Sequence, residues 1–196
     1  MNTHKTIGIA AGAFLAAVLV FSAFYYYGGY NTSSGSQYLT QSQLESLNVT
    51  EQGVYVSHAN STVYINSSTS LLVMAGPMNA PSMYSFEIQG LFNPTIVIKE
   101  GVTINFTVVN IDTDSEHNFV LSSQGPPYSY MNGMGSMGSG GYDSMTSMSF
   151  LPPTNSGHFY YYNVSYGFSQ TGTYWYLCTY PGHAENGMYG KIVVER

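Results

Sequence analysis

One stretch near the C-terminus carries the side chains of this chain that are best suited to chemistry. Residues 172–194 read Gly-Thr-Tyr-Trp-Tyr-Leu-Cys-Thr-Tyr-Pro-Gly-His-Ala-Glu-Asn-Gly-Met-Tyr-Gly-Lys-Ile-Val-Val and include the only cysteine, Cys178. His183 follows five residues later, and Met188 five residues after that. A spacing of five does not align side chains on one helix face, which needs three or four. With its proline and glycines, the segment is predicted to be a loop folded around a point, between two strands.

The chemical types of these side chains indicate which ion they would bind. A thiolate, an imidazole and a weakly bound thioether are ligands of a mononuclear blue-copper centre, which needs one more histidine. Zinc prefers four firm nitrogen, sulfur or oxygen donors and gains little from a thioether. A dinuclear copper site bridged by two cysteines is excluded because the chain has one cysteine.

The second histidine is expected to come from an earlier strand. His117 lies in Asp114-Ser-Glu-His-Asn-Phe-Val-Leu121, where it follows the strand-like run 102–109 and opens another apolar run. We therefore predict one type 1 copper per chain, with His117, Cys178, His183 and Met188 as its ligands. A lone cysteine is often only a small buried hydrophobe, but Cys, His and Met in one glycine-punctuated loop favour the copper site.

The copper-loop segment resembles that of the rusticyanin-type cupredoxins, acid-stable blue-copper proteins of iron-oxidising microbes. The resemblance is carried by Tyr-Leu-Cys-Thr-Tyr-Pro-Gly-His-Ala-Glu-Asn-Gly-Met-Tyr-Gly-Lys-Ile-Val-Val at residues 176–194. Four upstream features extend it over roughly residues 40–196: Ser85-Phe-Glu-Ile88, Asn93-Pro-Thr-Ile96, the strand ending at Asn110, and Gly125-Pro-Pro-Tyr128. The archaeal sulfocyanins are a close alternative.

The resemblance implies a cupredoxin-like fold and an electron carrier that passes electrons from iron or sulfur oxidation toward a terminal oxidase. One position departs from the rusticyanin pattern. The residue after the first copper histidine is Asn118, where rusticyanins carry serine. Asparagine is the commoner cupredoxin residue there, so the site is retained, but tuning specific to rusticyanin at this position cannot be carried over.

The pattern of strands and turns independently favours an all-β, two-sheet Greek-key β-sandwich. Many short strands follow one another with turn residues between them, and no convincing core helix interrupts them. Expected strands are 54–57, 62–65, 71–75, 84–88, 95–98, 102–109, 118–121, 159–164, 173–177 and 191–194. In residues 102–109, apolar and polar side chains alternate, as in a half-buried antiparallel strand. A short helix over 40–47 is expected to be capped by Thr40, with Leu44 and Leu47 on one face.

The N-terminal region is predicted to anchor the protein to a membrane. Residues 6–27 contain no charge and end in Phe-Tyr-Tyr-Tyr, which is long enough to span a bilayer and fits an interfacial aromatic belt. Because positive residues tend to stay on the cytoplasmic side of a membrane, Lys5 is expected inside the cell. The rest of the chain is then expected on the extracellular or periplasmic face. The alternative is a signal peptide cleaved after Ala23. Residues 1–27 are thus an anchor, 28–39 a flexible tether and 40–196 the copper domain.

The composition bears on the surroundings in which the protein works. Charged residues make up only 7%, against about 25% in ordinary globular proteins. In strong acid, carboxylates are largely protonated, so a surface of neutral hydrogen-bonding groups keeps its properties; a secreted glycoprotein surface is the alternative. No basic run indicates nucleic-acid binding. Six N-x-[ST] sequons occur, at Asn31, Asn48, Asn60, Asn66, Asn105 and Asn163.

A glycine-rich loop over residues 131–148 carries five methionines. Thioethers are soft ligands for Cu(I) that do not have to lose a proton to bind. The loop could therefore capture copper, which would make the chain a copper-delivery protein. A mobile surface loop or partner-docking patch is the other interpretation, because methionine adapts well to such surfaces.

A copper held by two histidines, a cysteine and a weak axial methionine has no open position for substrate, so we predict a one-electron carrier and no enzyme. A multicopper enzyme would need a further histidine cluster, which His4, His58 and His158 do not form. The edge of His183 is the expected electron port toward a redox protein such as a cytochrome or terminal oxidase. An apolar shell that raises the potential is expected from Phe119, Tyr128, Phe150 and Trp175.

Overall fold

The computed structural model describes residues 37–47, 53–128 and 149–196. The predicted membrane span at 6–27 and the methionine-rich loop at 131–148 lie outside these residues, so both stay predictions. Over the residues that the structure describes, no helix has the length and apolar character needed to span a membrane.

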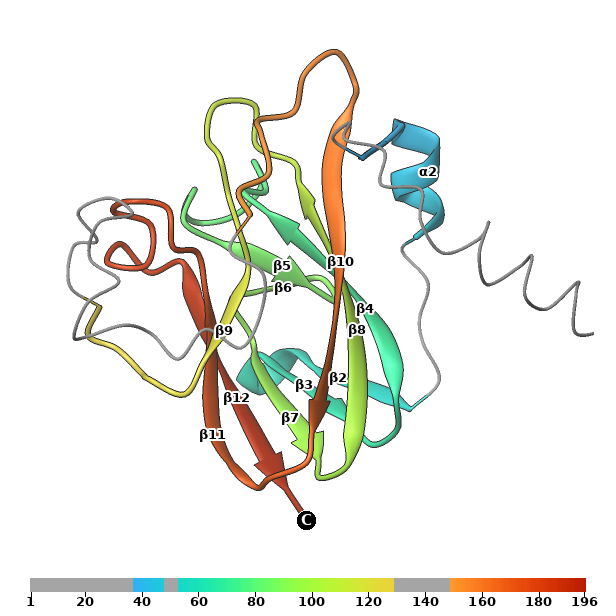
Figure 1. The fold of residues 1–196 in the computed structure, drawn as a ribbon, viewed down its shortest axis with the longest axis vertical. Coiled ribbons are helices and arrows are strands. Elements are labelled where there is room, and N and C mark those ends of the chain that lie inside the picture. The colour runs from blue at the N-terminus through green and yellow to red at the C-terminus, as the bar shows by residue number, and fades with distance from the viewer. Residues whose placement is uncertain (1–36, 48–52, 129–148) are drawn as a thin grey trace, which may run out of the picture. The chain divides into compact units, whose positions relative to one another are not determined.

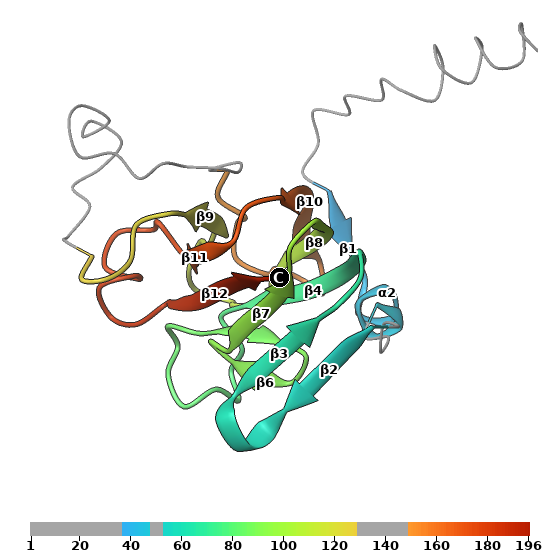
Figure 2. The same ribbon diagram turned by 90° about the horizontal axis from the view of Figure 1, so that it is seen from below.

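Two six-stranded sheets make up the fold (Figures 1 and 2). The first contains, in spatial order, β1 (Tyr38–Leu39), β10 (Phe159–Phe168), β8 (Val102–Asn110), β4 (Thr69–Ala75), β5 (Phe86–Ile88) and β6 (Leu91–Phe92). The second contains β2 (Val54–Ser57), β3 (Thr62–Ile65), β7 (Thr95–Lys99), β12 (Tyr189–Glu195), β11 (Gly172–Leu177) and β9 (Val120–Ser122). This arrangement confirms the predicted all-β, two-sheet sandwich.

The alternating strand β8 lies at the centre of the first sheet, between β10 and β4. Its apolar residues Val102, Ile104, Phe106 and Val108 are buried, as predicted, while the intervening polar residues are more exposed. The pairing with β10 is antiparallel and that with β4 is parallel. Strands β7 and β12 lie parallel to each other in the second sheet, and their buried side chains belong to the same core. Apolar alternation on both sheets therefore builds one core between them.

The N-terminal edge of the sandwich differs from the sequence-based expectation. Tyr38 and Leu39, which we placed in the tether 28–39, form the edge strand β1 and pair with β10. The next element is the short helix α2 (Gln41–Ser46), which Thr40 caps as predicted, in a capping box with Gln43. Leu44 is buried but Leu47 is 39% exposed. A two-residue strand has no periodicity of its own, so only its pairing reveals it.

The second sheet brings the two segments that carry the predicted ligands together at one end of the sandwich. β11 ends at Leu177 and β12 begins at Tyr189, and these two residues are paired. The chain from Cys178 to Met188 is therefore a loop closed at its neck, where the Cys178 N–H donates to the Met188 carbonyl at 3.0 Å. On its other side β11 pairs with β9, with Leu177 opposite Val120. This pairing carries the segment that precedes β9 to the same end.

Candidate metal centre

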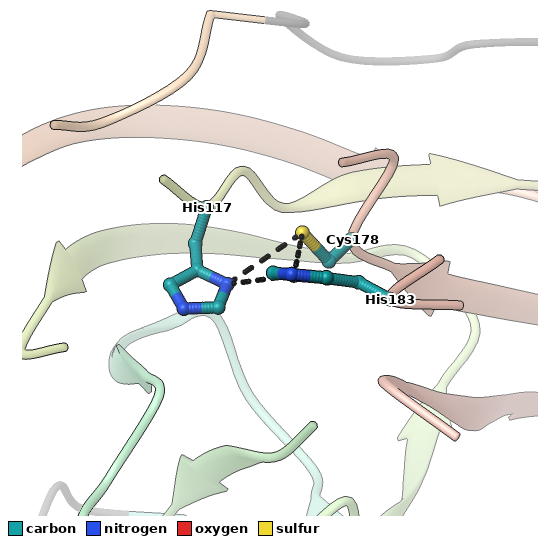
Figure 3. Close-up of side chains that lie close together, drawn as sticks. All are labelled: His117, Cys178 and His183. Atoms are coloured by element: carbon teal, nitrogen blue, oxygen red, sulfur yellow. Dashed lines mark hydrogen bonds between the residues drawn. The ribbon is translucent and has the colours of Figure 1, made fainter. Parts of the chain in front are cut away.

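Three of the four predicted ligands meet at this end of the sandwich (Figure 3). Cys178 Sγ lies 3.7 Å from His117 Nδ1 and 3.5 Å from His183 Nδ1. The two Nδ1 atoms are 3.2 Å apart. His117 and Cys178 are fully buried and His183 is 6% exposed. Among the described residues, this is the one cluster of histidine, cysteine and acidic side chains whose donor atoms converge closely enough for a metal.

The dimensions of this triangle fit a metal ion. A point about 2 Å from all three atoms exists within a triangle of these sides, which is the usual length of metal–nitrogen and metal–sulfur bonds. If both Nδ1 atoms are unprotonated, their lone pairs converge with Cys178 Sγ on the centre of this triangle. Two imidazoles with one thiolate are the donor set that copper takes in blue-copper centres.

The copper loop, residues 178–188, is held in place mainly by its own backbone. The Met188 N–H donates to the His183 carbonyl at 2.9 Å, and the His183 N–H donates to the Tyr180 carbonyl at 3.0 Å. Asn93 joins the loop to the first sheet: its Nδ2 donates to the Gly187 carbonyl at 3.0 Å and its Oδ1 accepts from the Phe86 N–H at 2.8 Å. These bonds hold the backbone from which the side chains of Cys178, His183 and Met188 project.

His117 lies outside the strands, in the segment between β8 and β9. Its N–H and carbonyl pair with those of Leu151 at 3.2 and 2.7 Å. Its Nε2 lies 3.0 Å from Asp112 Oδ2. When Nε2–H donates to this carboxylate, Nδ1 is left unprotonated and faces Cys178 and His183, as a metal ligand must.

Burial and hydrogen bonding shift the pKa values of the groups at this site. Burial lowers the pKa of His117, although the hydrogen bond and charge of Asp112 act in the opposite direction. Burial also lowers the pKa of His183 to about 4, with repulsion from His117 as a second cause. Burial raises the pKa of the Cys178 thiol to about 11 without a metal. The histidines are therefore poised to bind a cation, while the thiol must release its proton on binding.

Asp112 is a site residue that the sequence analysis missed. Burial would raise the pKa of its carboxyl, but hydrogen bonds from His117 and from the backbone of Asp114 and Ser115 outweigh burial and lower that pKa. The only sequence signal is a polar turn before His117, which also contains Glu116. Nothing in that pattern distinguishes the one carboxylate that turns inward.

Of the four aromatic residues predicted to form the shell, Phe119 belongs to the same core cluster as Cys178, and the other three pack on residues of the copper loop or of the strands beside it. Phe119 is fully buried and packs against Phe86, Phe106 and Tyr176. Tyr128 is buried in a small cluster with Leu177 and Ala184. Phe150 packs against Tyr180, and Trp175 against Tyr189. Sequence reasoning missed Tyr84, whose ring centroid lies 5.4 Å from that of His183, because it reaches the site from the turn before β5.

The remaining predicted residues have simpler surroundings. Met188 is fully buried and belongs to the same core cluster as Cys178. His158 packs edge-on against Tyr38 with ring centroids 4.1 Å apart. His58 lies in an exposed turn, His58–Asn60. Neither belongs to the metal cluster, and His4 lies outside the described residues.

The comparisons with known proteins agree with this geometry. The model of the copper-binding proteins of the plastocyanin/azurin family matches residues 90–195. Rusticyanin from Acidithiobacillus ferrooxidans is 34% identical over 134 residues, which are 68% of this chain and 67% of that protein. Rusticyanin from Acidithiobacillus ferridurans is 33% identical with the same coverage.

Solved rusticyanin structures share the fold. A reduced rusticyanin has a TM-score of 0.69 and 29% identity, with 82% of this chain and 100% of that chain covered. A rusticyanin from Thiobacillus ferrooxidans has the same TM-score and identity, with 82% and 97% covered. The chain therefore belongs to the plastocyanin/azurin family of copper-binding proteins, the cupredoxins, within which it is similar to rusticyanin and carries one type 1 copper site.

Proposed function

We propose that this protein is an acid-stable, membrane-anchored one-electron carrier on the outer face of the cell membrane. It would pass electrons from iron or sulfur oxidation toward a terminal oxidase. The observation that carries the proposal is the convergence of His117, Cys178 and His183 in a buried site at one end of the sandwich. The similarity to rusticyanin supports the choice of this pathway.

We assign the copper ligands to His117, Cys178 and His183, with Met188 as the weak axial donor. When bound, the copper accepts and returns one electron. The chain's own contribution is to hold the donors in place. The hydrogen bonds around His183 and Met188, and those between His117 and Leu151, limit the change in ligand positions when the copper changes oxidation state. Burial of the donors keeps water away from the site.

We assign the electron port to the edge of His183, the least buried of the four residues. The rings of Tyr84 and Tyr180 contact it, with centroids 5.4 and 4.6 Å away. Next to Tyr84 in the chain lies Met83, which is 56% exposed. Apolar and aromatic side chains such as these suit short-lived docking of a redox protein such as a cytochrome or oxidase, because they carry no charge to desolvate.

The membrane location and acid stability rest on the sequence. The uncharged segment 6–27 supports an anchor, and the 7% charged residues support a surface that changes little in acid. The copper-delivery alternative depends on residues 131–148, which lie outside the described residues, and no structural observation favours it.

A visible spectrum with copper analysis of the full chain tests the assignment. We expect one copper per chain and an intense thiolate-to-Cu(II) band, which Cys178→Ser abolishes. Voltammetry should show a reversible one-electron couple. Retention of the band in Cys178→Ser, or a wild-type protein that binds copper without a thiolate band, would rule out this function.

A further inference from the structure

We propose that Asp112 is a positioning residue for the copper site. Its carboxylate holds the His117 ring in the Nε2–H tautomer, and its negative charge favours the oxidised state, so it lowers the reduction potential. Gly76 provides the space in which this contact forms. The inference rests on the proposed function in one respect, that His117 is a copper ligand.

The carboxylate of Asp112 is held so that one oxygen is reserved for His117. Its Oδ1 accepts from the backbone N–H of Asp114 at 2.8 Å and that of Ser115 at 3.4 Å. Its Oδ2 lies 3.0 Å from His117 Nε2. Rotation of the carboxylate would break the bonds to Oδ1, so the turn fixes the direction from which the imidazole is approached.

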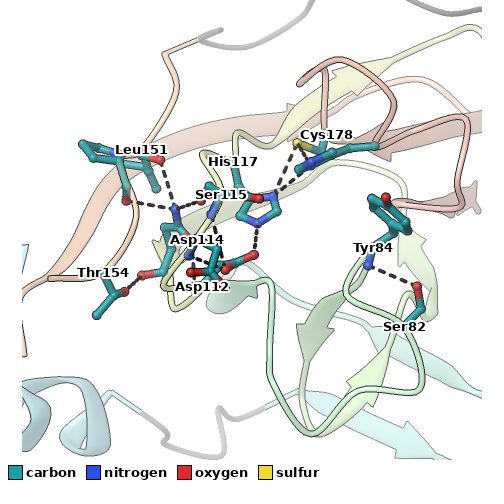
Figure 4. Close-up of polar contacts among 12 residues, drawn as sticks. Ser82, Tyr84, Asp112, Asp114, Ser115, His117, Leu151, Thr154 and Cys178 are labelled. Atoms are coloured by element: carbon teal, nitrogen blue, oxygen red, sulfur yellow. Dashed lines mark hydrogen bonds and ion pairs between the residues drawn. The ribbon is translucent and has the colours of Figure 1, made fainter.

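Asn110 fixes the turn that carries this carboxylate, the turn of Asp112, Asp114 and Ser115 shown in Figure 4. Its Oδ1 accepts from the Asp112 N–H at 3.0 Å. Its Nδ2 donates to the carbonyls of Ser115 and Leu151 at 2.9 and 3.0 Å. Because Leu151 also pairs with the backbone of His117, one buried asparagine holds both partners of the contact. The Asp112–His117 distance is therefore set by the fold and not by two free side chains.

Gly76 closes over the contact from the end of β4. Its φ of +69° lies in the left-handed region. A Cβ at this position would lie 2.6 Å from Asp112 Cβ, 2.8 Å from His117 Nε2 and 2.9 Å from Asp112 Oδ2. No side chain fits there while the hydrogen bond is present. The backbone of Gly76 thus covers the bond, and a hydrogen bond kept from water is electrostatically stronger than an exposed one.

The negative charge of Asp112 should lower the reduction potential of the copper, and its hydrogen bond to His117 alone would not have this effect. An asparagine would offer a similar carbonyl oxygen to Nε2–H but no negative charge. A fixed anion that is one imidazole ring away from the metal stabilises the more positive oxidation state more strongly, and outer-shell partners of this kind make the histidine a stronger donor. If Asp112 only shaped the turn, replacing it by asparagine would leave the potential unchanged.

The first experiment separates the charge from the hydrogen bond. Midpoint potentials and Cu(II) affinities are measured at pH 7, where the carboxylate is ionised, for the full chain, Asp112→Asn, Asp112→Ala and Asp114→Asn. Asp114 has an exposed side chain in the same turn and controls for the loss of one charge. We expect Asp112→Asn to keep the blue band and raise the potential, and Asp112→Ala also to lose roughly 10- to 100-fold in Cu(II) affinity. Equal potentials for Asp112→Asn and Asp114→Asn would overturn the charge assignment.

The second experiment reads the tautomer without any metal. Nitrogen-15 NMR of the His117 ring in the copper-free protein should show Nε2–H in the wild type and loss of this preference in Asp112→Ala. Gly76→Ala should act similarly, whereas Gly90→Ala should not. Gly90 is a matched control because its φ is +72° and nothing lies within 4 Å of its added Cβ. Indistinguishable ring spectra for Gly76→Ala and Gly90→Ala would refute the role of Gly76.

The outcomes also separate this inference from the proposed function. A wild type without a thiolate band would refute the copper carrier, whatever the Asp112 variants do. A wild type with that band, whose potential and His117 tautomer both survive loss of the Asp112 carboxylate, would refute only the inference.

Discussion

Asn118 and Thr179, the residues that follow His117 and Cys178, hold each other through two hydrogen bonds of 2.7 Å. Asn118 Nδ2 donates to Thr179 Oγ1, and the Thr179 N–H donates to Asn118 Oδ1. Both bonds are buried and join chain segments 61 residues apart. This pair therefore links the two ligand segments directly and gives a structural reason for an asparagine at position 118.

Asn118→Ala is predicted to destabilise the copper-free protein. The substitution leaves the buried Thr179 N–H and Oγ1 without these partners, and each unsatisfied group costs about 1–3 kcal/mol. Thr179→Val removes only the hydroxyl partner and should cost less. Chemical denaturation of the three proteins measures the difference. Equal stabilities of wild type and Asn118→Ala would mean that the link is dispensable.

The two histidines are predicted to differ in how readily an external ligand replaces them. In His183→Gly, imidazole should restore the blue band quickly, because His183 is 6% exposed and reaches the surface. In His117→Gly, the vacated space is fully buried, so imidazole should enter slowly or not at all. Stopped-flow absorption at the thiolate band compares the rates. Faster restoration in His117→Gly would contradict the assignment of the electron port to His183.

Met188→Leu tests the axial ligand. The variant should keep the blue centre and raise its potential, because loss of a weak donor destabilises Cu(II) more than Cu(I). Voltammetry of the variant beside the wild type gives the shift. An unchanged potential would show that the Met188 thioether is not a ligand and that this buried side chain serves packing only.

The response of the copper-free protein to acid follows from the lowered pKa of His183. Burial, with repulsion from His117, lowers that pKa from 6.5 to about 4. The unfolded chain therefore binds a proton that the folded chain resists, so stability should fall as the pH drops from about 6.5 toward about 4 and should not fall further from this cause. Denaturation at several pH values measures the fall. A stability that is independent of pH across this window would contradict the burial of a neutral His183.

The copper-bound protein should tolerate much more acid. A histidine with a lowered pKa competes poorly for protons, and a bound metal lowers its proton affinity further. We predict that the blue band of the oxidised protein persists to about pH 2, several units below the free-histidine pKa. An acid titration followed at the thiolate-to-copper band tests this. Bleaching at pH 4 to 5 would refute acid adaptation.

The anchor is tested by fractionating cells that express the full chain. We expect the protein in the membrane fraction with residues 6–27 retained, since an uncharged segment of this length can span a bilayer. Protease added to intact cells or spheroplasts should reach the copper domain. A soluble protein whose N-terminus begins after Ala23 would identify the segment as a cleaved signal peptide instead.

Some features of this protein depend only on residues that are close together in the sequence, and these features could be predicted from the sequence alone. Cys178, His183 and Met188 lie in one loop, so their types and spacing alone indicated a copper site. Strand β8 shows its buried face by simple alternation, because each residue points away from the next. The cap at Thr40 was equally local, since its partner Gln43 is three residues away.

Tertiary structure decided the features that join distant segments. Asp112, Asp114 and Glu116 look alike in sequence, and only the packing of the turn on Asn110 directs the first of them to His117. Strand β1 exists only through its pairing with β10. Gly76 must be a glycine because the chain at the end of β4 passes close to the Asp112–His117 contact, which is made by residues more than thirty positions later. A hydrogen bond between distant segments forms only when the fold brings both of them together. The sequence of one segment therefore does not indicate which residue of the other it will contact.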